Sequence, residues 1–333
     1  MEIPMIDFGE LRGENRNKTM SLLHAACENW GFFQARISAF SLYCESNLGL
    51  AMLTEEMTGH GLTFLQIENH GVDKSLMEKV KSLVKSHYEQ NLKANFYESE
   101  IASQLVTGRN SKTDWETTFF ISHQPNSNIT EIPSLSKDLC TALEEYIAQL
   151  IMLAEQLSEL MCENLGLDKD HIKKSFSGER GPSMGTKVAI YPQCPQPEQV
   201  RGLREHTDAG GIILLLQDDQ VPGLEFLKDG KWVQIPPSKN NTIFINTGDQ
   251  VEILSNGRYK SALHRVMAER NGSRLSIATF YNPASDAVIS PAPKLLYPNQ
   301  FTFGDYLKLY ATTKFLEKEP RFETLKKMAG TVA

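Results

Sequence analysis

The 333-residue sequence lacks the features of several protein classes. Its five cysteines are odd in number and form no C-x-x-C pair, which argues against a disulfide framework or a zinc finger and favours a reducing compartment. No apolar run approaches the roughly 20 residues that span a bilayer. The opening residues, MEIPMIDFGEL, lack the basic and apolar segments of a secretory signal. We therefore expect a cytoplasmic protein with no membrane partner.

Basic residues are also fewer than acidic residues in this chain. It carries 34 Lys and Arg residues against 41 Asp and Glu residues, a formal net charge of −7, and no dense basic run. Nucleic acid is therefore not an expected partner. Apolar residues make up 41% of the chain and charged residues 23%, which is the composition of an ordinary globular protein and argues against disorder.

Two kinds of hydrophobic pattern divide the chain. Up to about residue 180, apolar residues recur at helical spacing, most clearly between Leu139 and Met161. From Gly185 to Pro283, short strand-like runs alternate with turn signals such as Asp229-Gly230. The runs are Gly185–Tyr191, Ile212–Leu216, Leu224–Leu227, Trp232–Ile235, Thr242–Asn246, His264–Ala268 and Leu275–Tyr281.

Many short strands at regular spacing predict an antiparallel sandwich or barrel. We therefore expect an α+β protein with a mainly β core, a double-stranded β-helix (jelly roll) with flanking helices. Its expected parts are a mainly helical N-terminal region at 1–180, the jelly-roll core at 181–285 and a C-terminal helical segment at 286–333.

The segment 35–66 interrupts this organisation. Trp30–Gln34 (WGFFQ) resembles the start of a buried strand that Ile67–Val72 (IENHGV) would continue, and the 32 residues between them show no clean periodicity. One hypothesis is a translated intron, since codons for Gln34-Ala35-Arg36 can contain a GC-type splice donor and codons for Leu65-Gln66 an acceptor end.

The alternative is that segment 35–66 is a genuine loop. Thr63–Gln66 would then replace Gly31–Gln34 in the strand, and the barrel would survive because closing a long loop costs little more than closing a short one.

His206-Thr207-Asp208, with His264 56 residues after Asp208, predicts a metal site. Residues i and i+2 of a strand point to one face, so His206 and Asp208 can converge on one ion. A third ligand from another strand would complete a two-histidine, one-carboxylate set, which leaves one face of an octahedral Fe(II) open. An isolated H-x-D more often makes ordinary hydrogen bonds, but the strand-rich surroundings favour the metal site.

Arg274 and Ser276 share one face of a predicted strand, ten residues after His264. A guanidinium fork beside a hydroxyl suits a carboxylate ligand. The alternative is a surface strand that begins with a charge, and the nearness of a candidate metal ligand favours the carboxylate anchor.

These residues resemble those of the plant non-haem Fe(II) dioxygenases that share a double-stranded β-helix. Asn69-His70-Gly71-Val72 and Tyr191–Pro195 (YPQCP) match landmarks of that superfamily. Within it, the sequence is most similar to the 1-aminocyclopropane-1-carboxylate oxidases. The matching stretches are Gly185–Val188, Leu203-Arg204, Asn256–Arg265 and Lys314–Glu323.

The resemblance implies an enzyme that oxidises 1-aminocyclopropane-1-carboxylate with O₂ and ascorbate to ethylene, cyanide and CO₂. It implies Fe(II) as cofactor, bicarbonate or CO₂ as activator, and no use of 2-oxoglutarate. The metal ligands would be His206, Asp208 and His264.

The resemblance also implies roles for residues around the metal. Arg274 and Ser276 would hold a carboxylate, together with Tyr191, whose counterpart touches the co-substrate in relatives that use 2-oxoglutarate. The additional catalytic candidates are three basic residues: Lys187 and Arg204, as partners of ascorbate or bicarbonate, and Arg321, which with Lys314 lies on a segment that closes over the site.

Without the resemblance, several of these residues have simpler interpretations. Lys187 also fits a solvated strand-edge charge, Arg204 a partner of Glu205 or Glu198, and Tyr191 a packing residue. Arg321 also fits an exposed helix with i,i+4 pairing.

Two positions depart from the family pattern, since Ile190 replaces a polar residue and Glu205 a small one. Two functional alternatives also stay open. The first is a 2-oxoglutarate-dependent hydroxylase or desaturase of a plant small molecule, and the second is an inactive splice-variant product.

Overall fold

The computed structural model describes residues 3–36, 72–106, 114–238, 242–290 and 301–327. The motif Asn69-His70-Gly71 and most of the segment 35–66, including Thr63–Gln66, lie outside these residues. Among the described residues, no helix combines the length and apolar character that crossing a membrane requires.

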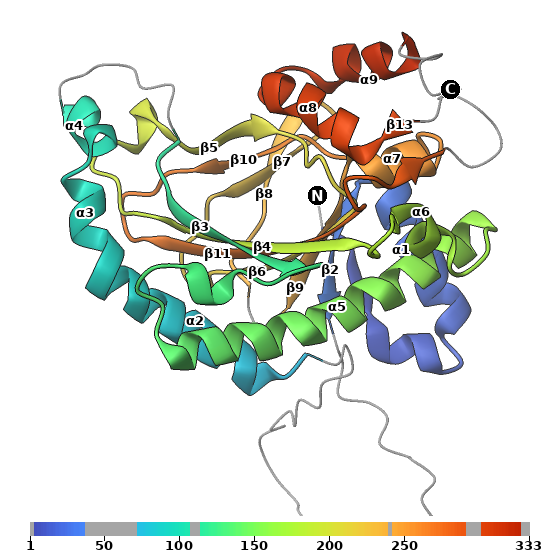
Figure 1. Ribbon diagram of the computed structural model, residues 1–333, viewed down its shortest axis with the longest axis horizontal. Helices are drawn as coiled ribbons and strands as arrows, with labels where there is room; N and C mark the ends of the chain where they lie inside the picture. Colours follow the sequence, from blue (N-terminus) through green and yellow to red (C-terminus); the bar gives the residue numbers. More distant parts are fainter. Residues whose placement is uncertain (1–2, 37–71, 107–113, 239–241, 291–300, 328–333) are drawn as a thin grey trace, which may run out of the picture.

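A seven-stranded sheet forms one wall of the β core (Figure 1), in the order β1-β2-β9-β6-β11-β4-β3. Its neighbours are antiparallel except for the parallel pair β1–β2. The strands are β1 Met5–Asp7, β2 Phe32–Arg36, β3 Thr117–Gln124, β4 Ser183–Tyr191, β6 Ile212–Gln217, β9 Ile243–Thr247 and β11 Arg274–Asn282.

A four-stranded antiparallel sheet, in the order β5-β10-β7-β8, faces the large one. Its strands are β5 Arg201–His206, β7 Leu224–Lys228, β8 Lys231–Gln234 and β10 His264–Met267. Side chains of both sheets, among them Phe32, Leu215, Phe226 and Val266, form one buried apolar cluster between them. The predicted jelly roll is therefore confirmed, and a small sheet of β12 (Val288–Ile289) and β13 (Phe301–Thr302) accompanies it.

The other face of the large sheet is covered by helices (Figure 1), in a second and larger apolar cluster. The longest is α5, Lys137–Leu165, which begins at Ser136, whose hydroxyl accepts the Leu139 N–H, and ends at Gly166 in the left-handed region. The predicted stripe from Leu139 to Met161 is its buried face. The remaining α-helices of the described chain are α1 Arg16–Asn29, α2 Lys74–His87, α3 Lys93–Tyr97, α4 Glu100–Val106, α6 His171–Phe176, α7 Asp249–Leu254, α8 Phe303–Thr313 and α9 Lys318–Lys327.

Single helical turns complete the regular structure. They are η1 Phe8–Arg12, η3 Ile129–Glu131 and η4 Pro197–Gln199, with the π-helical turn η2 Tyr88–Leu92 between α2 and α3.

The N-terminal region is less purely helical than its pattern predicts. It supplies β1, β2 and β3, and β3 pairs with β4 at the edge of the large sheet. Since only Ile121 of β3 is fully buried, its sequence carries no clear alternation of apolar and polar residues.

The expectation that Thr63–Gln66 displaces Gly31–Gln34 from the strand is wrong. Phe32–Arg36 form β2 and pair with β9 from Phe32–Asn246 to Ala35–Ile243. Gly31 opens this strand at φ +74°, and a Cβ there would lie 2.2 Å from the carbonyl oxygen of Lys260. Residues 32–35 therefore keep their place beside β9. The strand begins at Gly31, a position where any other residue would be strained.

We expect Gly31→Ala to reduce the free energy of unfolding by about 2–4 kcal/mol, because it combines a left-handed conformation with a steric clash. Gly230→Ala is the matched control: its φ is also +74°, but no atom lies within 4 Å of the added Cβ. It should cost only about 1 kcal/mol. Chemical denaturation of the two variants measures the difference, and equal losses would contradict the close approach at Gly31.

Candidate active site

Two histidines meet where two strands of the smaller sheet pair. His206 is the last residue of β5 and His264 the first of β10, and the two are direct partners in the antiparallel ladder. Asp208 lies beyond the end of β5, in the turn that follows. The expected reason for convergence, a shared strand face, is therefore wrong for Asp208, because the turn and not the strand brings its carboxylate to the histidines.

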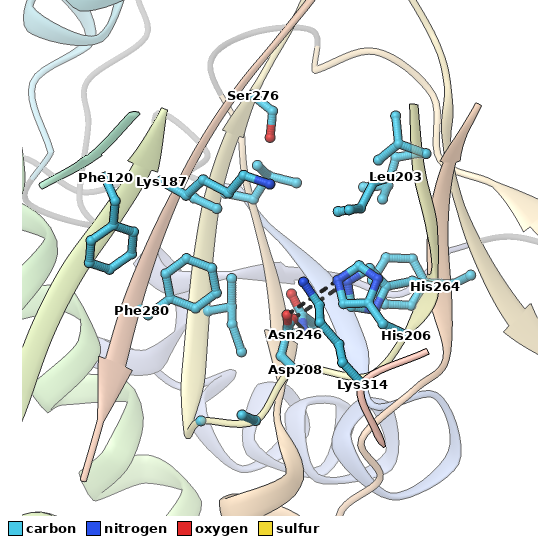
Figure 2. A pocket seen from close by; sticks show the side chains of 18 of the residues that line it. Phe120, Lys187, Leu203, His206, Asp208, Asn246, His264, Ser276, Phe280 and Lys314 are labelled. Atoms are coloured by element: carbon cyan, nitrogen blue, oxygen red, sulfur yellow. Dashed lines mark hydrogen bonds and ion pairs between the residues drawn. The ribbon is translucent and has the colours of Figure 1, made fainter. Parts of the chain in front are cut away.

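The three side chains are close enough to bind one ion (Figure 2). The Nε2 atoms of His206 and His264 lie 3.8 and 3.6 Å from the two carboxylate oxygens of Asp208, and the three ligand atoms fall within 4.8 Å of one another. All three residues are buried. Two imidazoles and one carboxylate are the donor set of non-haem Fe(II) oxygenases.

Hydrogen bonds prepare these side chains for a metal. The Nδ1 atom of His206 lies 2.8 Å from the Arg204 carbonyl, and Nδ1 of His264 lies 3.1 Å from the Ala262 carbonyl. Because a carbonyl only accepts, each Nδ1 carries the proton and each Nε2 keeps a free lone pair toward Asp208. Burial lowers the pKa of His206 well below its usual value, and His264 nearby lowers it further, so the ring is neutral. The residues present therefore fit a divalent iron ion.

The carboxylate of Asp208 is also oriented by its surroundings. Asn246 of β9 donates from Nδ2 to Oδ2 of Asp208 at 2.8 Å. This bond links the metal cluster to the large sheet on the opposite side of the core.

The cluster opens into a cavity of about 270 Å³ between the two sheets. Its polar lining consists mainly of amide, hydroxyl and basic side chains, and its walls are apolar and aromatic (Figure 2). The polar residues besides the cluster are Lys187, Tyr191, Asn246, Arg274, Ser276, Asn282, Tyr310 and Lys314.

Arg274 has the strongest features of an anion anchor. It is 1% exposed, it donates from Nη2 to Gln217 at 3.0 Å, and its Nε and Nη1 have no hydrogen-bond partner among the described residues. Ser276 lies two residues further on β11 and lines the same cavity. Buried donors without a partner are costly, so a bound carboxylate would complete their hydrogen bonding. The ring of Tyr191 lies 5.5 Å from the guanidinium.

Lys187 and Lys314 bring two further cations to the cavity. Lys187 comes from β4, which is an interior strand, so it is not a solvated strand-edge charge. Its Nζ contacts both carboxylate oxygens of Glu116, at 2.7 and 2.8 Å. Lys314 follows α8, and burial and the charge of Lys187 lower its pKa.

Arg204 does not line the cavity. Its guanidinium lies 3.7 Å from the ring centre of Phe315 and pairs with Asp114, Nε to Oδ1 at 2.9 Å, rather than with Glu205 or Glu198. Glu205 instead pairs with Arg265, the residue after His264, at 3.0 Å.

Arg321 is buried and does not line the cavity either. Its Nη2 donates to the hydroxyl of Thr207 at 2.7 Å and to Asp249 at 3.1 Å. The alternative of an exposed helix is therefore wrong for this residue, which is 2% exposed.

Sequence reasoning missed Asp114, Glu116, Asn246 and Asp249. Each reaches the site through a hydrogen bond to a residue far away in the chain. Asp114 binds Arg204 across 90 residues, and Asn246 binds Asp208 across 38. No local pattern signals such contacts.

Comparisons with known proteins agree with this geometry. Residues 182–283 match the family model described as the 2OG-Fe(II) oxygenase superfamily. The chain is 62% identical over 330 residues to 1-aminocyclopropane-1-carboxylate oxidase 1 of Arabidopsis thaliana, covering 99% of this chain and 96% of the relative. It is 45% identical over 342 residues to 1-aminocyclopropane-1-carboxylate oxidase 3 of Cucumis melo, with coverage of 99% and 96%.

A solved structure shows the same architecture. The crystal structure of JOX2 in complex with 2OG, Fe and JA is similar with a TM-score of 0.75 at 29% identity, covering 97% of this chain and 89% of that one. Together with the histidine–aspartate cluster, these similarities identify an Fe(II)-dependent oxidoreductase. The chain belongs to the 1-aminocyclopropane-1-carboxylate oxidase family of the 2OG-Fe(II) oxygenases.

Proposed function

We propose that this protein oxidises 1-aminocyclopropane-1-carboxylate with O₂ and ascorbate to ethylene, cyanide and CO₂, the final step of ethylene biosynthesis. The observation that carries the proposal is the cluster of His206, Asp208 and His264, which opens into a small cavity whose lining includes the cations of Lys187, Arg274 and Lys314. The 62% identity to a named oxidase over nearly the whole chain supports the choice of substrate.

His206, Asp208 and His264 would hold the Fe(II). When bound, the iron would supply open coordination positions and one-electron redox chemistry. The neutral imidazoles present their Nε2 lone pairs, and Asn246 fixes the carboxylate of Asp208. These hydrogen bonds hold the three side chains in the orientation that metal binding requires.

The cavity suits a small amino acid. Arg274 and Ser276 would bind its carboxylate. Nε and Nη1 of Arg274 have no hydrogen-bond partner among the described residues, and Ser276 lines the same cavity. Tyr191, Phe120 and Phe280 would pack against the carbon skeleton and exclude water. The same anchor would also accept bicarbonate, because bicarbonate and a carboxylate both present a planar group whose negative charge is shared by two oxygens.

Ascorbate as reductant and bicarbonate or CO₂ as activator belong to this proposal. Lys187 and Lys314 supply positive charge to the cavity wall for such anions. A corresponding role for Arg204 rests on the resemblance alone, since its guanidinium pairs with Asp114 outside the cavity lining. The free Cys27, Cys140, Cys162 and Cys194 support a reducing compartment, which we take to be the cytoplasm.

The decisive experiment is headspace ethylene from the purified full chain with Fe(II), ascorbate, bicarbonate and 1-aminocyclopropane-1-carboxylate, without 2-oxoglutarate. We expect ethylene above a metal-free control. Turnover that requires 2-oxoglutarate would favour the hydroxylase alternative. Ethylene from a chain lacking Ala35–Gln66 and none from the full chain would show that this form is inactive.

Asp208→Ala should abolish ethylene formation and weaken Fe(II) binding more than about 100-fold. Removing a residue that only orients a metal ligand weakens metal binding about 10- to 100-fold, and removing the ligand itself should weaken it more. Ethylene production and metal titration measure the two effects. Asp168→Ala, at an exposed carboxylate, is the control and should behave like the parent chain. An active Asp208→Ala variant would place the metal elsewhere.

Arg274→Ala should raise the KM for 1-aminocyclopropane-1-carboxylate about 10- to 100-fold, because a charged hydrogen bond to a carboxylate contributes about 1.5–3 kcal/mol. Fe(II) affinity should be retained. Arg270→Ala is the control, since this nearby arginine pairs with Glu198 at the surface. A collapse of Fe(II) affinity in Arg274→Ala would make the role of Arg274 structural.

A further inference from the structure

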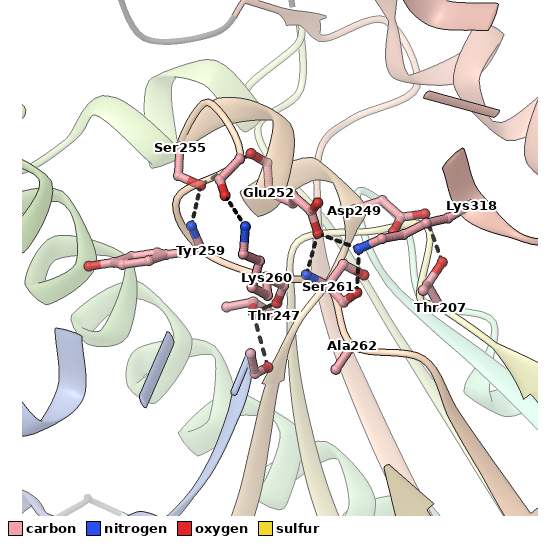
Figure 3. A network of polar contacts seen from close by, with 12 residues as sticks. Thr207, Thr247, Asp249, Glu252, Ser255, Tyr259, Lys260, Ser261, Ala262 and Lys318 are labelled. Atoms are coloured by element: carbon pink, nitrogen blue, oxygen red, sulfur yellow. Dashed lines mark hydrogen bonds and ion pairs between the residues drawn. The ribbon is translucent and has the colours of Figure 1, made fainter. Parts of the chain in front are cut away.

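Two ion pairs join helix α9 to the short helix α7, one almost fully buried and one partly buried, and Figure 3 shows the second, between Lys318 and Glu252. Arg321 pairs with Asp249, Nη2 to Oδ2 at 3.1 Å, with both side chains almost fully buried. Lys318 pairs with Glu252, Nζ to Oε2 at 2.7 Å. Within each helix the two charges are three residues apart and so lie on one face. We call these four residues the α7–α9 clasp.

The first ion pair holds the turn that carries Asp208. Arg321 donates to the Thr207 hydroxyl at 2.7 Å, and that hydroxyl donates to Asp249 at 3.2 Å. The backbone N–H of Asp249 donates to the Asp208 carbonyl at 2.8 Å. Tyr310 of α8 donates to the Thr207 carbonyl at 2.5 Å. The residue between two candidate metal ligands is therefore bonded to three helices.

The second ion pair holds the segment that leads to His264. Lys318 donates to the Ser261 carbonyl at 2.7 Å, and the Ser261 N–H donates to the Glu252 carboxylate at 2.5 Å (Figure 3). Ser261 precedes Ala262, whose carbonyl fixes the ring of His264 through Nδ1. Helix α9 thus donates directly to Thr207, next to His206 and Asp208, and to Ser261, on the segment before His264. Each of its two donating cations is also paired with a carboxylate of α7.

Stability alone does not account for this arrangement. Burying an ion pair generally costs as much as the pairing returns. The cost is plain at Arg321 and Asp249, because Nε of the first and Oδ1 of the second have no hydrogen-bond partner among the described residues. What both pairs share is a direct bond to a segment that carries a metal ligand.

We propose that the α7–α9 clasp is a positioning device for the metal centre: it sets the places of Asp208 and His264 and so the affinity of the site for metal. This role rests on the proposed ligand assignment. It makes Arg321 and Lys318 positioning residues that act through Thr207 and Ser261. The C-terminal helix then contributes to metal binding without touching the metal.

The test is titration of the metal-free full chain with Co(II), with visible ligand-field absorption as the readout. Lys318→Met and Arg321→Met should each raise the Co(II) Kd about 10- to 100-fold, the range for residues that orient metal ligands. They should also alter the absorption band, since the ligand geometry changes.

Matched controls test whether the effect depends on where the lost charge lies or only on the loss of a positive charge. Lys308→Met removes an exposed lysine that pairs with Asp305 on α8, and Arg270→Met removes an exposed arginine that pairs with Glu198. Both should leave the Kd within about twofold, because exposed pairs contribute little. Glu252→Gln keeps the shape of its side chain, and its combination with Lys318→Met should be non-additive.

Clasp variants that lose thermal stability but bind Co(II) with the parent Kd and spectrum would overturn the proposal. If Arg321→Met does not fold, Lys318→Met and Glu252→Gln decide the outcome, since Lys318 is partly exposed. Asp208→Ala is the reference. Parent-like Co(II) binding in Asp208→Ala would overturn the ligand assignment and the clasp together, whereas loss of binding only in Asp208→Ala would overturn the clasp alone.

Discussion

The pairing of His206 with His264 across β5 and β10 is the constraint on which the site depends. Antiparallel register places the two residues directly opposite each other, so their rings approach to 4.3 Å between centres. A slip of one residue would turn one ring to the outer face of the sheet. On the far side of β10, His264 pairs with Phe226 of β7, and the two rings stack at 4.7 Å, which holds the imidazole against the core.

The basic residues around this pairing differ in whether a carboxylate of the chain pairs with them. Lys187, Arg204, Lys318 and Arg321 are each matched by a carboxylate of this chain. Arg274 is instead bonded to the neutral amide of Gln217, and burial lowers its pKa while its remaining donors face no acceptor in the described residues. A buried guanidinium that lacks an anionic partner supports the proposal that Arg274 binds a carboxylate ligand.

The sequence predicted the parts of this site that depend on short-range patterns. Strand alternation and turn signals located β4, β6, β7 and β11, and the i, i+2 spacing placed Arg274 and Ser276 on one side of β11.

The positions of Asp208, Asn246 and the clasp residues could not be predicted in this way. The turn after β5 is shaped by bonds from α7, α8 and α9, which are 40 or more residues away, and α7 is a six-residue helix whose pattern is too short to recognise.

The strand β2 links the segment that follows residue 36 to the metal cluster. β2 pairs with β9 through Phe32–Asn246, and Asn246 in turn donates to Asp208. The pairing is complete from Phe32 to Ala35, and Gly31 fixes its start against Lys260. Because a longer connection between Arg36 and Val72 adds only about 0.6 kcal/mol of closure cost per doubling of length, it leaves this pairing intact. The physical expectation is therefore that the full-length chain, with segment 35–66 present, keeps the support that β9 gives to the metal cluster.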